Sequence, residues 1–157
     1  MKYSEDMNYF DTTVHPAKSL GEIQELLSDF GVTNMIVTQG SAGDKLAWLV
    51  RFQWNDRSYH FVFQPLACRW PAKVSSFGGK KRAHEEQSKY QMGRIAVYFV
   101  KAILTAAEMN QDALFGFLEL PGMTRTGGIP PTAAQVDVSE FVGLLPNINL
   151  PQLEDGK

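Results

Sequence analysis

Several features that would assign a chain to a class of protein are missing or scarce in these 157 residues. The single cysteine, Cys68, excludes an intramolecular disulfide and a metal site built from several cysteines, which suits a reducing compartment. No run of eighteen apolar residues occurs and the N-terminus is acidic, so we expect neither a membrane span nor a signal peptide. With 17 acidic and 15 basic residues, the net charge of −2 attracts neither nucleic acid nor an anionic membrane to the whole molecule.

Motifs for metal, nucleotide or nucleophilic chemistry are also missing. The three histidines do not have the spacing of a metal site; they are His15, His60 and His84. The stretch GGKKR at 78–82 lacks the first glycine of a phosphate-binding loop and has Lys81 where Ser or Thr would hold magnesium. Cys68 lies beside Arg69, but a lone cysteine after a strand is usually a packed side chain. We therefore expect no metal and no cofactor, and the sequence leans against an enzyme.

The chain does contain the periodic patterns of one α+β domain, and 44% apolar residues suffice for a single core. Ser19 with Glu22 forms a capping box, and Gly31 fits a helix C-cap. The expected order is β-α-β-β-β-α-α, with an antiparallel meander of three to four strands and the helices packed on one face. The expected elements are a strand at 9–16, a helix between Ser19 and Gly31, three strands between 33 and 64, a long helix at about Lys80–Met109 and a short helix at 112–120.

The register of the last two meander strands follows from a two-residue turn at Asn55–Asp56. Residues directly opposite one another then share a face, and a slip by one residue would exchange the faces. One face becomes an apolar ladder of Trp48, Val50, Phe52, Tyr59, Phe61 and Phe63. We expect the long helix to cover this ladder with Ile95, Phe99, Ala102, Ile103 and Ala106.

The opposite face of the sheet is half apolar, and none of the expected elements covers it. If a five-residue loop at 40–44 keeps the register of the first meander strand, this face carries Met35, Val37, Leu49, Arg51, His60 and Val62. Each apolar side chain left in water there forfeits about 1.5 kcal/mol or more. We therefore predict that these residues form an interface.

The composition changes after residue 122. A linker at 123–135, rich in Gly, Pro and Thr, precedes an apolar tail that contains Phe141 and Leu145. We expect residues 1–122 to form one domain and residues 123–157 to dock on the chain's own sheet or on that of a neighbour, because so short an apolar segment cannot fold alone. A homodimer in which the tail or the sheet crosses the interface is the favoured arrangement.

Short patterns occur in a fixed order over residues 12 to 122. They are TTV at 12–14, S..EI at 19–23 followed by Gly31, Phe61 with Pro65, R......KA.L.A.E at 94–108, and LPG at 120–122. In this order they resemble a group of short hypothetical proteins encoded by tailed phages and prophages. The resemblance implies a phage or prophage origin and a place in the cytoplasm of the bacterial host, and it transfers no catalytic residue.

One cluster of basic and aromatic residues follows the meander. This basic loop contains Arg69, Trp70, Lys73, Phe77, Lys80, Lys81 and Arg82. Such side chains can contact a phosphate backbone and stack on a base. Glu85 and Glu86 on the next helical turn, together with the acidic net charge, count against this interpretation.

Two classes of function remain open. The first is an accessory protein that acts by binding protein chains: its own copy, or another phage or host protein. The alternative is an accessory of phage DNA replication or recombination that holds single-stranded nucleic acid with the basic loop. An enzyme ranks third, because no acid, base and nucleophile can be placed within reach of one another from the sequence.

Overall fold

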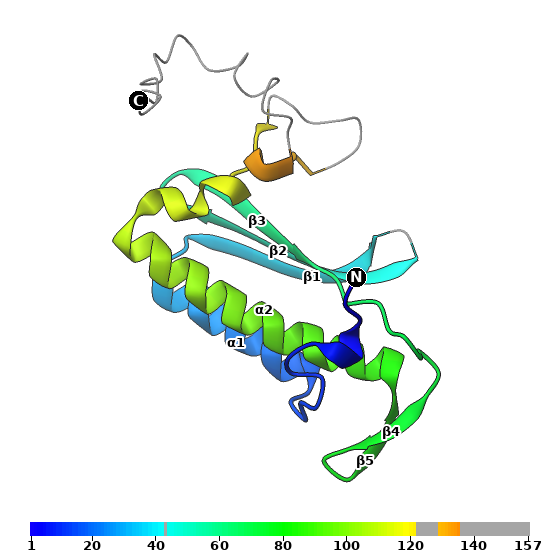
Figure 1. The fold of residues 1–157 in the computed structure, drawn as a ribbon. Helices are drawn as coiled ribbons and strands as arrows, with labels where there is room; N and C mark the ends of the chain where they lie inside the picture. Colours follow the sequence, from blue (N-terminus) through cyan, green and yellow to red (C-terminus); the bar gives the residue numbers. More distant parts are fainter. Residues whose placement is uncertain (43, 122–128, 136–157) are drawn as a thin grey trace, which may run out of the picture.

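The computed structural model describes residues 1–42, 44–121 and 129–135, and the fold is α+β with antiparallel sheets, as expected (Figure 1). The helices are α1 (Pro16–Phe30) and α2 (His84–Met109), with 3-10 helices η1 (Ser4–Asp6), η2 (Gln111–Phe117) and η4 (Ala133–Gln135). The strands are β1 (Asn34–Ala42), β2 (Lys45–Trp54), β3 (Arg57–Phe63), β4 (Val74–Phe77) and β5 (Lys80–Ala83).

The main sheet has two different faces. Its strands lie in the order β1-β2-β3, and α1 and α2 lie side by side across one face, which we call the inner face (Figure 1). Side chains from both helices and from this face form one apolar core. The opposite face, the outer face, has no helix packed across it in the described part of the chain (Figure 1). The molecule therefore has two layers.

The predicted register of β2 and β3 is confirmed at each position from Trp54 opposite Arg57 to Trp48 opposite Phe63. Asn55 and Asp56 form the two-residue turn, both with positive φ (48° and 60°), which short polar side chains tolerate best. The expected ladder lies on the inner face. Five of its six side chains are buried and Phe63 is partly buried.

The register of β1 corrects one part of the prediction. Met35 lies opposite Phe52 and Val37 opposite Val50, so both side chains belong to the inner face, not the outer one. The strands extend until Ala42 pairs with Lys45, which leaves two residues between them where a five-residue loop was expected. The outer face of β1 instead carries Ile36 and Thr38, because side chains alternate between the faces.

The buried stripe of α2 is displaced by about one residue from the expected one. It consists of Met92, Ala96, Val97, Val100, Leu104 and Ala107. Ile95, Phe99, Ile103 and Ala106 lie at its border, and Ala102 is exposed. The reason is that α2 packs against α1 as well as the sheet. Arg94 is buried there, and its guanidinium binds Ser19 Oγ and Glu22 Oε2 of α1, both at 2.7 Å.

The expected first strand at 9–16 is wrong. Residues 9–15 form a turn and irregular backbone, and α1 already begins at Pro16, capped by His15, whose Nδ1 accepts from the Ala17 N–H at 3.1 Å. Ser19 is therefore a buried helical residue and not the cap. The expected end is confirmed, because Gly31 adopts φ 94° at the C-cap.

A hairpin replaces the irregular connection expected before the long helix. Strands β4 and β5 pair across a turn at Gly78–Gly79, both with positive φ. Lys80–Ala83 is consequently strand, and α2 begins at His84 instead of about Lys80. The hairpin extends from the end of the molecule where α2 starts (Figure 1).

The segment after α2 returns to β3. The expected short helix is 3-10 helix η2, which ends at Phe117. Leu118 then bridges Tyr59 of β3, and Thr132 bridges Glu119 in turn. Residues 129–135 of the expected linker thus pack beside this sheet edge. Phe141, Leu145 and the rest of the expected tail lie outside the described residues.

The close contact between the two helices gives a matched pair of tests. A Cβ at Gly93 of α2 would lie 2.8 Å from Ser19 Oγ and 2.9 Å from Ser19 Cβ, whereas one at Gly21 of α1 would have no atom within 4 Å. We predict that Gly93→Ala lowers the free energy of unfolding by about 1–3 kcal/mol through overpacking. Gly21→Ala, by contrast, raises it by about 0.5–1 kcal/mol, because alanine favours the helix. Urea denaturation of both variants measures this, and equal effects would contradict the packing.

Candidate functional site

The N-terminal segment is held against the start of α2 by side chains of that helix. Gln87 donates to the carbonyl groups of Phe10 and Thr12, both at 2.7 Å. Gln91 donates to the carbonyl of Ser4 at 3.0 Å, and the Ser4 hydroxyl donates in turn to the Gln91 side-chain oxygen. Irregular backbone has no ladder of its own, so these amides satisfy groups that would otherwise be buried without partners.

Glu5 is the acidic centre of this contact. Its Oε2 accepts from the N–H of Arg69 at 2.9 Å, and its Oε1 accepts from the N–H of Trp70 at 3.1 Å and lies 3.0 Å from His84 Nδ1. The side chain is only 9% exposed. Burial alone would raise the pKa of Glu5, but the hydrogen bonds from Arg69, His84 and Trp70 outweigh it and lower the pKa to about 2. Glu5 is therefore a buried carboxylate at neutral pH.

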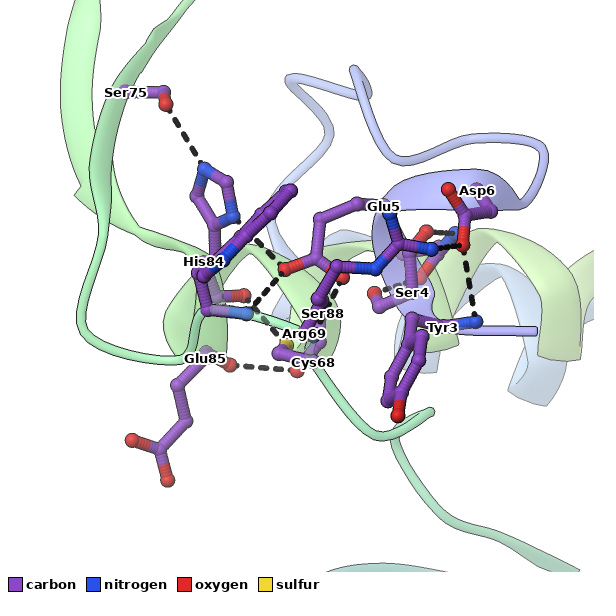
Figure 2. Close-up of polar contacts among 12 residues, drawn as sticks. Tyr3, Ser4, Glu5, Asp6, Cys68, Arg69, Ser75, His84, Glu85 and Ser88 are labelled. Atoms are coloured by element: carbon purple, nitrogen blue, oxygen red, sulfur yellow. Dashed lines mark hydrogen bonds and ion pairs between the residues drawn. The ribbon is translucent and has the colours of Figure 1, made fainter. Parts of the chain in front are cut away.

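His84 continues the contact toward the hairpin. Its second ring nitrogen, Nε2, lies 2.9 Å from Ser75 Oγ of β4. The imidazole side chain is 6% exposed and packs edge-on against the rings of Phe10 and Phe77. Figure 2 shows the result, a line of hydrogen bonds from Ser75 through His84 to Glu5. We call these three residues the Ser75 relay.

The proton positions in the Ser75 relay follow from its acid. An ionised carboxylate can only accept, so His84 Nδ1 donates to Glu5. In the neutral imidazole, Nε2 is then left as the acceptor for the Ser75 hydroxyl. A hydroxyl, a base and an acid that orients the base are the parts of an activated nucleophile.

Cys68 lies beside the Ser75 relay without belonging to it (Figure 2). Its Sγ donates to the main-chain oxygen of His84 at 3.4 Å. Burial raises the pKa of the Cys68 thiol, so the thiolate is disfavoured. The thiol is thus packed and protonated. No group of acidic, histidine or cysteine side chains in the described part of the chain is placed to hold a metal ion.

Three members of the expected basic loop are engaged within the protein. Arg69 forms an ion pair with Asp6 at 2.6 Å. The Arg82 guanidinium lies 4.1 Å from the centre of the Tyr90 ring. Phe77 is buried. Arg82 and Phe77 are thus held within the protein, whereas the Arg69 side chain is 44% exposed and its ion pair lies at the surface.

The other four members of the basic loop also lie on the surface. Trp70 is 49% exposed, and the ammonium group of Lys73 lies 5.0 Å from the centre of its ring. Lys80 and Lys81 are exposed at the tip and on the second strand of the hairpin. The surface therefore offers one indole and three lysines, with Arg69 beside them in an ion pair, a smaller set than the sequence suggested.

Part of the outer face of the sheet is covered by the chain itself, and part of it is exposed. Near β3, Glu119 is buried and binds Arg51 through both carboxylate oxygens, at 2.6 and 2.7 Å, and His60 Nδ1 at 3.0 Å. Ile36 of β1 and Val62 of β3 are uncovered, at 56% and 47% exposure. The predicted interface residues Arg51 and His60 thus hold the chain's own Glu119, while Val62 and part of Leu49 remain on the surface.

Sequence reasoning missed Glu5, Ser75 and Glu119. Glu5 and His84 are 79 positions apart, and Ser75 belongs to a hairpin that the sequence did not predict. The sequence did contain one signal for the hairpin, the Gly78-Gly79 pair, which is typical of a two-residue turn.

No known protein family matches the chain, and no curated protein or solved structure is detectably similar to it. None of the described helices is long and apolar enough to cross a membrane.

The lowered pKa of Glu5 gives a test of the N-terminal contact. A carboxylate with a depressed pKa stabilises the fold above its ordinary value of 4.5, and this contribution, up to about 3 kcal/mol, is lost as the pH falls toward 2. We predict that Glu5→Gln destabilises the protein at pH 7 and that the difference from wild type disappears near pH 2. Denaturant titrations across this range measure it.

The control for that experiment is Glu25→Gln. Glu25 is an exposed glutamate of α1, without an ion pair in the described part of the chain. This variant should follow the wild-type pH dependence. A Glu5→Gln variant that follows it too would show that Glu5 is not held as described.

Proposed function

We propose that the protein is an accessory protein that acts by self-association, through the free edge of its main sheet. The observation that carries the proposal is β1, a nine-residue strand that pairs only with β2 in the described part of the chain. Natural edge strands are usually short or protected by charged residues, proline or a bulge. The sequence of β1, NMIVTQGSA, contains no charged residue and no proline.

A second copy of the chain is the partner that this edge fits best. Two β1 strands can pair antiparallel about a two-fold axis, which joins the two sheets into one and removes both edges. Because β1 carries no charge, such pairing brings no like charges together. The exposed Ile36 and Val62 of both copies would then extend across one continuous outer face.

We further propose, from the resemblance to short phage and prophage proteins, that the protein has a phage or prophage origin and acts in the bacterial cytoplasm.

A charge on β1 tests the proposed pairing. We predict that Ile36→Lys raises the dimer dissociation constant by about tenfold or more, because an ammonium group replaces an apolar side chain in both copies of a symmetric interface. Sedimentation equilibrium over a range of concentrations measures the constant. The matched control is Val74→Lys on the hairpin, an apolar strand residue that is 58% exposed against 56% for Ile36, and it should leave the constant unchanged.

A full-length chain that stays monomeric at high micromolar concentration would contradict the proposed dimer. A chain that ends at Gln135 tests whether residues 136–157, and not a second copy, occupy the edge of β1. If only this shorter chain dimerises, residues 136–157 of the same molecule occupy the edge.

A second candidate function is contact with single-stranded nucleic acid, and the exposed Trp70 with Lys73 over its ring is the observation that favours it. If the surface binds nucleic acid, changing Lys73, Lys80 and Lys81 to Glu should weaken binding by about tenfold or more and reduce the slope of log K against log salt by about 2. Fluorescence anisotropy with a labelled oligonucleotide measures both. The matched control reverses three exposed lysines elsewhere, Lys18, Lys45 and Lys101. An equal loss of affinity in both triple variants would show that net charge, and not this surface, causes the binding.

A further inference from the structure

We propose that Ser75, His84 and Glu5 form a nucleophile, a general base and an orienting acid, and that Ser75 accepts the acyl group of a small carboxylic ester. This activity goes beyond self-association and uses a different part of the molecule. Its basis is the geometry of the Ser75 relay, with Ser75 Oγ 2.9 Å from His84 Nε2 and His84 Nδ1 3.0 Å from Glu5 Oε1. Both separations are within the range of a nucleophile held by its base and of a base held by its orienter.

The acid and the base of the Ser75 relay are less exposed than the nucleophile, as acyl transfer to a serine requires. Glu5 and His84 have nearly buried side chains, at 9% and 6% exposure, whereas Ser75 is half-buried on the hairpin. A buried acid holds the imidazole in one tautomer, and a nucleophile must be reached by its substrate. The imidazole cannot turn freely, because the rings of Phe10 and Phe77 pack against it.

Glu5 is held in position by two backbone N–H groups in addition to His84. The N–H groups of Arg69 and Trp70 bind its two oxygens and leave Oε1 aimed at His84. Each of these bonds favours the charged carboxylate. An ionised Glu5 also stabilises the imidazolium that forms when Ser75 gives up its proton.

Arg82 supplies positive charge on the same face of the hairpin. It is the direct cross-strand partner of Ser75, so both side chains project from one face. Its Nε donates to Gln87 at 2.9 Å and its guanidinium lies over Tyr90, which together fix its position. The Arg82 guanidinium thus adds a positive charge beside the strand position of Ser75, and this charge favours the negative charge that develops on an ester oxygen.

The proposed reaction needs only an ester and water. Ser75 Oγ attacks the carbonyl carbon while its proton passes to His84 Nε2, and the carbonyl oxygen becomes an oxyanion. When the carbonyl re-forms, the bond to the leaving alcohol or phenol breaks, and His84 returns the proton to that oxygen. Water then attacks the acyl-serine with His84 as base, which releases the carboxylic acid and restores the Ser75 hydroxyl.

The test uses p-nitrophenyl acetate as the probe on the full-length protein. We expect a burst of about one p-nitrophenol per chain, as for an acyl-enzyme that accumulates, and an acetyl group on Ser75 in the peptide mass spectrum. Ser75→Ala should abolish both. Ser76→Ala, which changes the exposed neighbour in the same strand, should leave the burst rate within about twofold, because Ser76 points to the opposite face of the hairpin from His84.

Two further variants separate chemistry from folding. His84→Gln should slow the acylation of Ser75 by about 100-fold or more, because the general base is lost. Glu5→Gln should slow it by a similar factor, because the neutral amide no longer stabilises the imidazolium, although its oxygen can still accept a backbone N–H. Circular dichroism establishes which variants are folded. The site-specific acylation rate of Ser75 in a folded variant is a readout that a merely structural contact would not change.

The outcomes are distinct. Acetylation confined to lysines or to the N-terminus, with Ser75 unmodified in folded wild-type protein, would overturn the proposal. So would a Ser75→Ala variant that retains the burst, or a folded Glu5→Gln variant that acylates at the wild-type rate. None of these results depends on whether the protein dimerises.

Discussion

The two-residue turn at Asn55–Asp56 is the constraint on which the rest of the fold depends. Side chains of a strand alternate between faces, so the length of this turn decides which residues of β2 and β3 meet the helices. Both turn residues adopt positive φ, which matches the twist of the flanking strands. Because β2 is also paired with β1, a turn one residue longer would move Tyr59 and Phe61 of β3 to the outer face and bring His60 toward the helices. The apolar core therefore follows from two short polar residues.

A second constraint acts at the opposite end of the molecule, where α2 begins. Its first turns use buried polar side chains, His84, Gln87 and Gln91, to bind backbone and side chains of the N-terminal segment. Buried polar groups are costly unless each is satisfied, and here each has a partner. The arrangement fixes the ring of His84 in position and direction. A fixed imidazole between a carboxylate and a hydroxyl is the same geometry whether it serves stability or chemistry, so only reactivity distinguishes the two.

The sequence was sufficient where the structure is set by local rules. The Asn-Asp turn and the alternation of aromatic residues determine the β2–β3 register, and Gly31 determines the end of α1. It was insufficient where distant residues decide. The segment at 9–16 has the composition of a strand, yet Gln87, far along the chain, binds the carbonyl groups that strand pairing would use. The face of β1 was misassigned because its loop is shorter than expected, which reverses the alternation of side chains.

The buried ion cluster of Arg51, His60 and Glu119 on the outer face closes one edge of the main sheet and leaves the other edge open. Glu119 would be costly to bury alone, but Arg51 and His60 bind it and draw the segment at 118–120 against the edge of β3. With this edge occupied by the chain itself, β1 is the remaining edge of the main sheet in the described part of the chain. Any further strand that joins the main sheet must then pair with β1. On the outer face, this edge carries the exposed Ile36, whereas the edge at β3 carries the buried carboxylate of Glu119. The hairpin with the Ser75 relay belongs to a separate two-stranded sheet, so pairing at β1 leaves its geometry unchanged.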